Sequence, residues 1–389
     1  MATEKGVWNV QEVRDKQLLG EWSYDGAGQL WTTGWNIYGA LGLNQAGPSI
    51  QISSPTQVPG TNWYEVSYPK QYGRALGMKT DGSVWGWGAG ADGNLGLNEG
   101  STQRSSPVQI MAGPGSVGAL QAATLTSMVS DSDGNLWMWG ENNQGQLGHN
   151  QPDNKKVSSP IQIPGTWSKN ISLSVSVAGG VKTDGTLWLW GLQSNGTLGQ
   201  NETYNPSKKH RSSPSQVGSS SDWSTSRGGL SISSGVMALK TNGTLWMWGY
   251  GGNGGLGQND KTSRSSPVQI PGTTWAWVGN FGGSSSAIKT NGTFWSWGYN
   301  NAGMLGHNNQ TEYSSPKQVG TNTNWSKSWQ NELTSAAIKT DGTAWTWGAA
   351  GRGQQGHNDT TQYSSPKQVP GTYSWLSIAN YQGGFIRLL

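Results

Sequence analysis

The sequence predicts an all-β fold, a seven-bladed β-propeller with four short strands in each blade. The prediction depends on three observations. A tryptophan-rich phrase of the type KTDGTLWLWG, residues 182–191, occurs seven times in the 389 residues, in copies of varying completeness. The copies follow one another at intervals of about fifty residues, a period typical of propeller blades. The two ends of the chain carry complementary parts of one repeat, which indicates a ring closed by N- and C-terminal strands in one blade.

A β-hairpin is the first element of each repeat. In the copy at residues 285–298, the run SSAIK meets Asn-Gly and continues as TFWSWG. Asn-Gly or Asp-Gly between two strand-like runs is a strong signal for a two-residue hairpin turn. In another copy, Trp188 and Trp190 lie two residues apart and point to one face, while Leu187 and Leu189 point to the other. A strand that is apolar on both faces is expected between two neighbouring sheets.

Two further strands complete the repeat. A glycine-rich stretch follows each W-x-W-G phrase and ends in Leu-Gly, or in Gln355-Gly356 in the last copy. Glycine there permits a positive φ and a close approach of two backbones. Each repeat then contains Ser-Ser-Pro, whose proline fits the start or the edge of a strand. The last segment, such as GTTWAWVG from Gly272, supplies another tryptophan-bearing strand.

The chain ends test the ring. The sequence stops at GGFIRLL, which matches the first strand of a hairpin, and the N-terminal repeat begins at the second strand, GQLWTTG. We therefore expect Phe385–Leu388 to pair with the strand around Leu30 and Trp31, which would remove two exposed sheet edges. The expected organisation is an N-terminal segment over residues 1–19 and a propeller over residues 20–389.

Composition excludes several classes of protein. The chain contains no cysteine, so it can form neither a disulfide framework nor a thiolate metal site. The N-terminus lacks an apolar signal region, and no 18 apolar residues run together, so we expect neither a signal peptide nor a membrane span. The net charge is only +4, with basic clusters at Lys155–Lys156 and at residues 208–211. A nucleic-acid partner would need a broader basic face.

No catalytic, cofactor-binding or metal site is expected. Two G-x-G-x-x-G phrases, from Gly88 and Gly249, follow predicted strands, but no helix follows them to hold a pyrophosphate. His149, His307 and His357 occupy one repeat position, so blade rotation should keep them too far apart to share a metal. No nucleophile elbow is present. We therefore expect no enzyme, unless a buried acid–base pair in the central channel provides a site.

The loop between Leu-Gly and Ser-Ser-Pro differs in every repeat and is expected to cluster with its counterparts on one rim. Variable tips on a repeated rigid frame commonly carry binding function, and Arg and Tyr are frequent hot spots. Solvated tips without a binding role are the alternative. The candidate partner-binding residues are Arg104, Lys155, Lys156, Tyr204, Arg211, Arg264, Tyr313 and Tyr363.

Together, the phrases K-T-D/N-G-x-L-W-x-W-G, N-x-x-G-x-L-G and S-S-P-x-Q-V resemble the repeats of the regulator-of-chromosome-condensation family, over residues 20–389. The resemblance implies the propeller fold. It implies no single function, because that family includes a nuclear GTPase exchange factor on chromatin, a plant ultraviolet-B photoreceptor and secreted bacterial inhibitors of β-lactamase. The photoreceptor signature Gly-Trp-Arg-His-Thr is absent, no signal peptide is expected, and the basicity is weak, so none of these roles is expected here.

The N-terminal run KGVWNVQEVRDKQLLGEW, from Lys5, resembles the opening of structural proteins of tailed bacteriophages of aquatic bacteria. Asn9 could cap a helix whose Val10, Val13 and Leu18 form an apolar stripe, for docking on a neighbouring subunit or on the propeller itself. We therefore expect a virion structural protein, assembled in the host cytoplasm, that serves as a tail fibre or baseplate module or as a capsid decoration. Its expected partners are other virion proteins and a host cell-surface molecule. The alternative is a soluble intracellular adaptor or inhibitor that binds a protein through the same rim.

Overall fold

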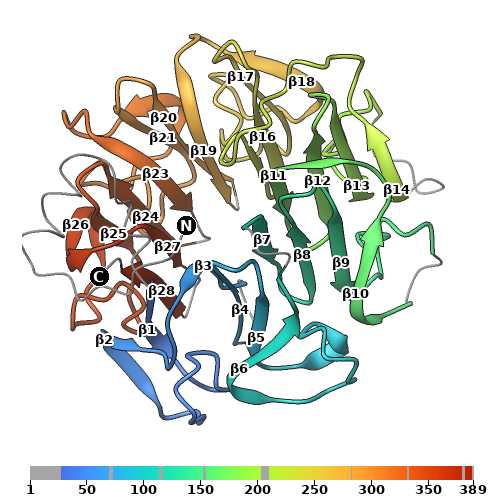
Figure 1. The fold of residues 1–389 in the computed structure, drawn as a ribbon. Coiled ribbons are helices and arrows are strands. Elements are labelled where there is room, and N and C mark those ends of the chain that lie inside the picture. Colours follow the sequence, from blue (N-terminus) through green and yellow to red (C-terminus); the bar gives the residue numbers. More distant parts are fainter. Residues whose placement is uncertain are drawn as a thin grey trace, which may run out of the picture.

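The computed structural model describes residues 28–69, 73–113, 117–151, 155–202, 210–281, 283–330, 333–378 and 382–387. These residues form seven four-stranded antiparallel sheets, arranged as blades around a central axis (Figure 1). The predicted seven-bladed propeller is confirmed. The predicted segment 1–19, with Val10, Val13 and Leu18 of its docking helix, lies outside the described residues, so its boundary and its helix stay predictions.

We number the blades from 1 to 7 around the ring and give the strands of each blade from the channel outward. Blade 1 contains β27 (Trp375–Ile378), β28 (Gln382–Arg387), β1 (Gln29–Trp35) and β2 (Gln51–Gln57). Blade 2 contains β3 (Trp63–Ser67), β4 (Arg74–Lys79), β5 (Val84–Gly88) and β6 (Arg104–Met111). Blade 3 contains β7 (Ala119–Ala122), β8 (Thr126–Ser130), β9 (Leu136–Gly140) and β10 (Val157–Ile163). Blade 4 contains β11 (Trp167–Leu173), β12 (Val177–Lys182), β13 (Leu187–Leu192) and β14 (His210–Gln216).

The remaining blades repeat this order. Blade 5 contains β15 (Leu230–Ile232), β16 (Gly235–Leu239), β17 (Leu245–Gly249) and β18 (Arg264–Ile270). Blade 6 contains β19 (Trp275–Phe281), β20 (Ser284–Lys289), β21 (Phe294–Gly298) and β22 (Tyr313–Gln318). Blade 7 contains β23 (Trp325–Gln330), β24 (Thr334–Lys339), β25 (Thr343–Gly348) and β26 (Tyr363–Thr372). A short 3-10 helix, η1 (Ala91–Gly93), lies in the long loop of blade 2.

Blade 1 joins both ends of the described chain. β28 pairs with β27 on one side and with β1 on the other, where Ile386 lies opposite Leu30 and Phe385 opposite Trp31. The predicted ring closure is therefore confirmed. Pro55 of the Ser-Ser-Pro phrase lies in the outer strand β2, at a sheet edge where the missing N–H costs little.

The repeated K-T-D/N-G-T-x-W phrase forms one hydrogen-bonded unit, shown here for blade 6. The side chain of Asn291 accepts hydrogen bonds from the Thr293 N–H at 3.2 Å and from its hydroxyl at 2.8 Å. The same hydroxyl accepts from Nε1 of Trp295 at 2.9 Å. The Lys289 ammonium lies 4.3 Å from the Trp295 ring centroid and 4.8 Å from that of Trp275, within cation–π range. Blades 4, 5 and 7 repeat all these contacts, so the phrase recurs for structural reasons.

A glycine and an asparagine in each long loop attach one blade to the next. A Cβ at Gly39, which has φ +80°, would lie 2.6 Å from Cα of Ser105 in blade 2. The N–H of Asn44, which has φ 57°, donates to the Ser105 carbonyl oxygen at 2.8 Å. The equivalent hydrogen bonds at the six other junctions join Asn98 to Ser158, Asn150 to Ser212, Asn201 to Ser265, Asn259 to Ser314, Asn308 to Ser364 and Asn358 to Ser53. The loop of each blade thus holds the Ser-Ser-Pro strand of the next.

The second tryptophan of the W-x-W-G phrase is buried between two blades. Nε1 of Trp87 donates to the Ala40 carbonyl oxygen of blade 1 at 2.7 Å. The equivalent tryptophans of blades 3 to 7 each donate to a backbone carbonyl oxygen of the preceding blade. Blade 1 carries Thr33 at this position, and its hydroxyl donates to the corresponding carbonyl oxygen, that of Gln354, at 3.1 Å. Blade 1 therefore keeps the hydrogen bond but lacks the indole ring.

Phe385 replaces that ring from the neighbouring strand. Its ring centroid lies 5.3 Å from that of Tyr373, much as the Trp87 centroid lies 5.6 Å from that of Trp63 in blade 2. A Cβ at Gly356 would lie 3.2 Å from the Phe385 ring. Blade 1 thus has an aromatic core of similar size, built from a different strand.

Candidate functional site

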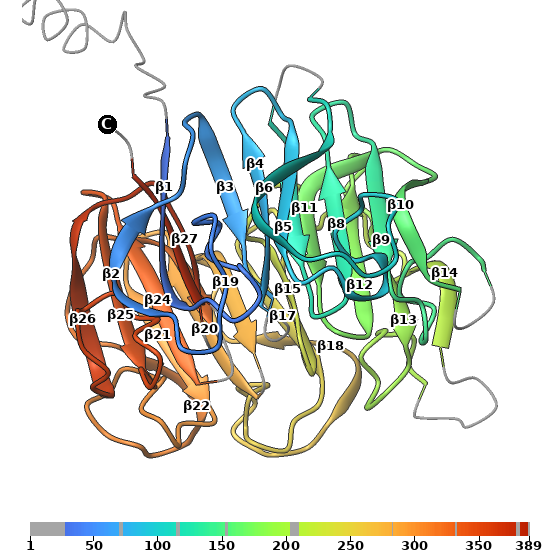
Figure 2. The same ribbon diagram turned by 90° about the horizontal axis from the view of Figure 1, so that it is seen from below.

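Two sets of loops leave every blade on the same side of the ring. Because the four strands of a blade are antiparallel, the loop between the first and second strands and the long loop between the third and fourth strands lie at one end of the sheet. We call this side the loop face. In Figure 2 the long loops beside β18 and β22 project from the lower edge of the ring.

Five candidate residues occupy equivalent positions on the loop face, at or next to the start of an outer strand. Each lies opposite the glycine that ends a W-x-W-G phrase. The pairs are Gly88 and Arg104, Gly191 and Arg211, Gly249 and Arg264, Gly298 and Tyr313, and Gly348 and Tyr363. The glycine has no side chain, so it leaves space beside the long arginine or tyrosine.

All three arginines bind an acidic residue of their own loop. Arg104 pairs with Glu99 at 2.8 Å, Arg211 with Glu202 at 3.2 Å, and Arg264 with Asp260 at 2.6 Å. Such exposed pairs contribute about 0 to 1 kcal/mol each to stability. Each pair connects one residue of the loop to the start of the outer strand.

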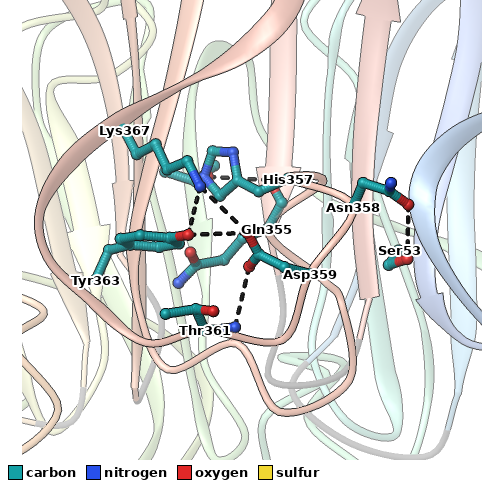
Figure 3. Close-up of polar contacts among 9 residues, drawn as sticks. Ser53, Gln355, His357, Asn358, Asp359, Thr361, Tyr363 and Lys367 are labelled. Carbon is teal, nitrogen blue, oxygen red and sulfur yellow. Dashed lines mark hydrogen bonds and ion pairs between the residues drawn. The ribbon is translucent and has the colours of Figure 1, made fainter.

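Tyr363 is part of a polar cluster in blade 7 (Figure 3). Its hydroxyl donates to Oδ2 of Asp359 at 2.8 Å and accepts a hydrogen bond from the Lys367 ammonium. Lys367 also lies 3.2 Å from Asp359. The His357 ring packs edge-on against Tyr363, with centroids 5.4 Å apart, and its Nε2 lies 2.8 Å from the Thr346 hydroxyl. These hydrogen bonds and the ring contact therefore hold Tyr363 against the residues of the long loop.

Blade 6 repeats this cluster without the carboxylate. Asn309 replaces the aspartate and donates to the Tyr313 hydroxyl at 3.2 Å, and the Lys317 ammonium donates to the same hydroxyl at 2.8 Å. The hydrogen bond from Lys317 lowers the pKa of Tyr313. The His307 ring lies 5.1 Å from the tyrosine ring.

The other candidates are distributed differently. Lys155 donates to the Gln151 side chain at 3.1 Å. Lys156 forms an ion pair with Asp92 in η1 of the preceding blade. Tyr204 lies outside the described residues. The structure thus places seven candidates in the loops and strand starts of six blades, where their partner-binding role stays a prediction.

The three histidines of the repeat stay apart. His149, His307 and His357 lie in blades 3, 6 and 7 and contact Ile161 O, Ser296 Oγ and Thr346 Oγ1 of their own blades. Within the described parts of the chain, no three His, Asp or Glu side chains form a group suited to a metal ion. The expectation of no metal, cofactor or catalytic site stays a prediction.

Burial of these histidines should make stability depend on pH. Burial, together with the Lys317 charge, lowers the pKa of His307 to about 4, whereas the unfolded chain should protonate it near 6.5. The unfolded state therefore takes up more protons between these values, so the free energy of unfolding should fall as the pH falls through this window. We expect His307→Asn to lose a few degrees less in melting temperature than the wild type between about pH 7.5 and about pH 4.5. An equal fall in melting temperature for His307→Asn and the wild type would contradict a lowered pKa of His307 in the folded protein.

A second candidate region is the central channel. Glu65 on β3 of blade 2 is fully buried and forms an ion pair with Arg227, which precedes β15 of blade 5. The Lys327 ammonium on β23 donates to the Ser374 carbonyl oxygen at 3.1 Å. Burial lowers the pKa of Lys327, and the nearby Arg227 charge lowers it further. A salt bridge within the channel thus connects β3 of blade 2 with the segment that precedes β15 of blade 5.

These channel residues are absent from the predicted site residues. Glu65 and Lys327 each stand two residues after a tryptophan that begins an inner strand, a position that other repeats fill with Lys169, Thr225, Trp277 and Ser377. Variation at one repeat position is the signal that could have found them. The sequence does not show which of those residues meet across the ring.

Repeats of a known family match part of this chain. The model of the Regulator of chromosome condensation (RCC1) repeat matches residues 81–124 and 133–182. The Ultraviolet-B receptor UVR8 of Arabidopsis thaliana is 27% identical over 256 residues, which cover 62% of this chain and 54% of the receptor. The mitochondrial RCC1 domain-containing protein RUG3 of the same plant is 28% identical over 203 residues, which cover 50% of this chain and 44% of RUG3. The chain therefore spans about half the length of these relatives.

Solved structures show the same fold. Yeast RCC1 (Prp20), in a crystal structure with Kap60 bound to it, has a TM-score of 0.80 at 15% identity, and the match covers 94% of this chain and 89% of that chain. A crystal structure of Prp20p from Saccharomyces cerevisiae, described together with its binding properties to Gsp1p and histones, also has a TM-score of 0.80, at 17% identity, and covers 94% and 92% of the two chains. At such low identity the likeness establishes the fold alone.

The expectation of a virion structural protein is wrong. The relatives are a receptor and a mitochondrial protein of a plant, and the similar structures are of a yeast protein; none of these is a component of a phage particle. The virion location is corrected with it, and none of these relatives supports virion or host-surface partners. The error came from an N-terminal phrase of few residues, which carries much less information than the seven repeats. The same relatives favour the alternative, a protein that binds protein partners.

Two further expectations have separate outcomes. The helical segments that the structure describes do not include one with the length and hydrophobicity needed to cross a bilayer. The expectation that the chain is not an enzyme stays a prediction, since the matched segments cover only part of each relative.

Proposed function

We propose that this chain is a protein-binding propeller, an adaptor or inhibitor that engages its partner through the loop face. One observation carries the proposal. Of the five large hydrophobic side chains that are exposed in the described residues, three lie in loops of this face, in blades 1, 4 and 5. They are Tyr38, Val175 and Tyr250. Exposed aromatic residues on an ordered surface are frequent anchors of protein interfaces.

The loops that carry the two tyrosines are well suited to binding. Asn44 in the loop of Tyr38 and Asn259 in the loop of Tyr250 attach these loops to the next blade, and the ion pair of Arg264 with Asp260 lies in the loop of Tyr250. Ordering a loop before association reduces the entropy lost on binding. The similar structures support this proposal, because yeast RCC1 (Prp20) forms a complex with a second protein, Kap60.

The test compares tyrosines of equal exposure on opposite faces. Tyr38 and Tyr250 are 39% and 37% exposed on the loop face. Tyr64 is 38% exposed near the start of β3, on the opposite face of the propeller. We expect a Tyr38→Ala/Tyr250→Ala variant to weaken partner binding by at least about tenfold, a loss of about 1.4 kcal/mol. Tyr64→Ala should bind as the wild type does.

The experiment is affinity capture from an extract of the source organism with the wild type and both variants, followed by calorimetric titration of the captured partner. Melting curves confirm that each variant is folded. A partner that binds all three proteins equally, or one that is lost only with Tyr64→Ala, would refute binding through the loop face. Failure to capture any specific partner with the wild type would also count against the proposal.

A further inference from the structure

Two equivalent tyrosines on the loop face differ in the groups that their hydroxyls contact. Tyr313 begins β22 of blade 6 and Tyr363 begins β26 of blade 7. Both are partly exposed, and both begin the phrase Tyr-Ser-Ser-Pro-Lys. The Lys317 ammonium lies 4.0 Å from the Tyr313 ring centroid, and the Lys367 ammonium lies 3.9 Å from that of Tyr363. The two sites are therefore alike in structure, and each serves as a control for the other.

The Tyr313 hydroxyl accepts hydrogen bonds from two donors. The Lys317 ammonium donates to it at 2.8 Å, and Nδ2 of Asn309 donates to it at 3.2 Å. The Asn309 amide is held in this orientation, because its Oδ1 accepts from the Thr311 N–H at 3.0 Å and its Nδ2 also donates to the His307 carbonyl oxygen at 3.2 Å. A cation and a second donor at a phenol oxygen favour the phenolate over the neutral phenol. The surroundings of Tyr313 thus favour loss of its proton.

The Tyr363 hydroxyl, by contrast, donates its proton to a carboxylate. Asp359 occupies the position of Asn309, and its Oδ2 accepts from the Tyr363 hydroxyl at 2.8 Å (Figure 3). Lys367 donates to the same hydroxyl but also lies 3.2 Å from the Asp359 carboxylate. A phenolate at Tyr363 would lose the hydrogen bond to Asp359 and would be repelled by its charge. The exchange of one amide for one carboxylate therefore separates a hydroxyl that loses its proton readily from one that retains it.

The other ionisable groups near Tyr313 do not oppose this difference. The His307 ring, 5.1 Å from the tyrosine ring, has a pKa lowered to about 4 by burial and by the Lys317 charge, so it is neutral at pH 7. The carboxylate of Glu312, the preceding residue, pairs at 3.0 Å with Lys261 in the long loop of blade 5. The hydrogen bonds from Lys317 and Asn309 lower the pKa of Tyr313, in agreement with the geometry.

We propose that Tyr313 is a nucleophilic tyrosine at which activated acyl compounds modify the chain covalently. The phenolate oxygen attacks the acyl carbon, and the Lys317 ammonium stabilises the negative charge that develops on the acyl oxygen. The bond from the acyl carbon to the leaving group then breaks, and the acyl group remains on Tyr313 as a phenyl ester. With an acyl imidazole as the donor, the imidazole leaves and gains one proton, which balances the proton that the phenol loses. This reactivity is independent of the proposed binding of a protein partner.

The probe is N-acetylimidazole, added to the full chain at neutral pH. Peptide mass spectrometry measures the acetylation rate of each tyrosine, and hydroxylamine, which removes acetyl groups from tyrosine but not from lysine, identifies the ester. We expect Tyr313 to react at least about tenfold faster than Tyr363, because each unit by which the pKa of Tyr313 is lowered raises its phenolate fraction about tenfold. Tyr64, which is 38% exposed, should also react more slowly than Tyr313, although exposure alone would make it reactive.

Reciprocal variants connect the rate to the neighbouring groups. Asn309→Asp gives blade 6 the carboxylate of blade 7 and should slow acetylation of Tyr313 by about tenfold, and Asp359→Asn should accelerate that of Tyr363 by about as much. Lys317→Met should slow Tyr313, whereas Lys317→Arg keeps the positive charge and should retain most of the rate. Melting curves confirm that each variant is folded.

The outcomes separate a nucleophilic tyrosine from ordinary surface chemistry. An acetyl group on Lys317 that is lost in Tyr313→Phe supports the proposal, because it shows transfer from the ester to the adjacent amine. Acetylation of Lys317 that persists in Tyr313→Phe, with Tyr313 of the wild type unmodified, contradicts it. The proposal is overturned as well if Tyr313 reacts no faster than Tyr363 and Tyr64, or if Asn309→Asp and Lys317→Met leave its rate unchanged.

Discussion

A chain that ends at Gly383 should lose most of its stability. The truncation deletes residues 384–389 and removes the buried side chains of Phe385 and Ile386 from blade 1. Loss of one buried phenylalanine side chain alone costs about 3 to 5 kcal/mol. The truncation also exposes the edges of β1 and β27, which β28 joins in the intact ring, and exposed edges promote association. We expect the melting temperature to fall by at least about 10 °C, measured by calorimetry or circular dichroism.

An exchange of two residues separates the side-chain effect from the loss of the strand. Thr33→Trp restores the tryptophan that blades 2 to 7 carry at this position, and Phe385→Ala restores a small residue on the neighbouring strand. Each change alone should destabilise, the first by overpacking and the second by a cavity. Together they should compensate, with a coupling energy of about 1 to 3 kcal/mol. Additive losses would show that Phe385 does not replace the missing ring, and an unchanged melting temperature of the truncated chain would refute closure by β28.

The fold could be predicted because its determinants are local and repeated. The turn asparagine or aspartate, the threonine and the tryptophan of one phrase bind each other within five residues, as Asn291, Thr293 and Trp295 do. The hydrogen bond from the asparagine of a long loop to a serine of the next blade recurs at a nearly constant sequence separation, as between Asn44 and Ser105 and between Asn98 and Ser158. Residues that contact each other at such short or constant separations produce a periodic pattern in the sequence, and this pattern predicts the fold.

The channel could not be predicted in the same way. Glu65 and Arg227 are 162 residues apart and belong to blades that are not neighbours. Their pairing depends on the diameter of the ring and on which inner strands face one another, and the repeat pattern contains neither. The ion pairs of the loop arginines, by contrast, could have been predicted, since Arg264 and Asp260 are only four residues apart, a spacing that suggests an internal ion pair.

Arg74 is the second position at which a single change should have a large effect. It begins β4 and is fully buried, although the residues at equivalent positions in the other blades are uncharged. Nη2 donates to the carbonyl oxygens of Ala123 and Thr126 at 2.7 and 2.8 Å, and Nη1 donates to the carbonyl oxygen of Asn94 and the hydroxyl of Ser127 at 3.1 and 3.0 Å. Arg74 therefore attaches blade 2 to blade 3. Burial lowers its pKa to about 9, so it remains charged at neutral pH.

Replacing Arg74 by methionine should lower the free energy of unfolding by about 3 to 5 kcal/mol. Hydrogen bonds from a charged donor contribute about 1.5 to 3 kcal/mol each, and methionine retains the packing of the aliphatic stem while it leaves buried acceptors such as Ala123 O unpaired. Arg264→Met is the matched control, because that arginine is partly exposed and pairs with Asp260, so its loss should cost less than about 1 kcal/mol. Urea denaturation measures both. Equal midpoints for Arg74→Met and the wild type would mean that the cost of desolvating the guanidinium cancels its four hydrogen bonds, as happens for some buried ionic groups, and that the contact between blades 2 and 3 depends on packing alone.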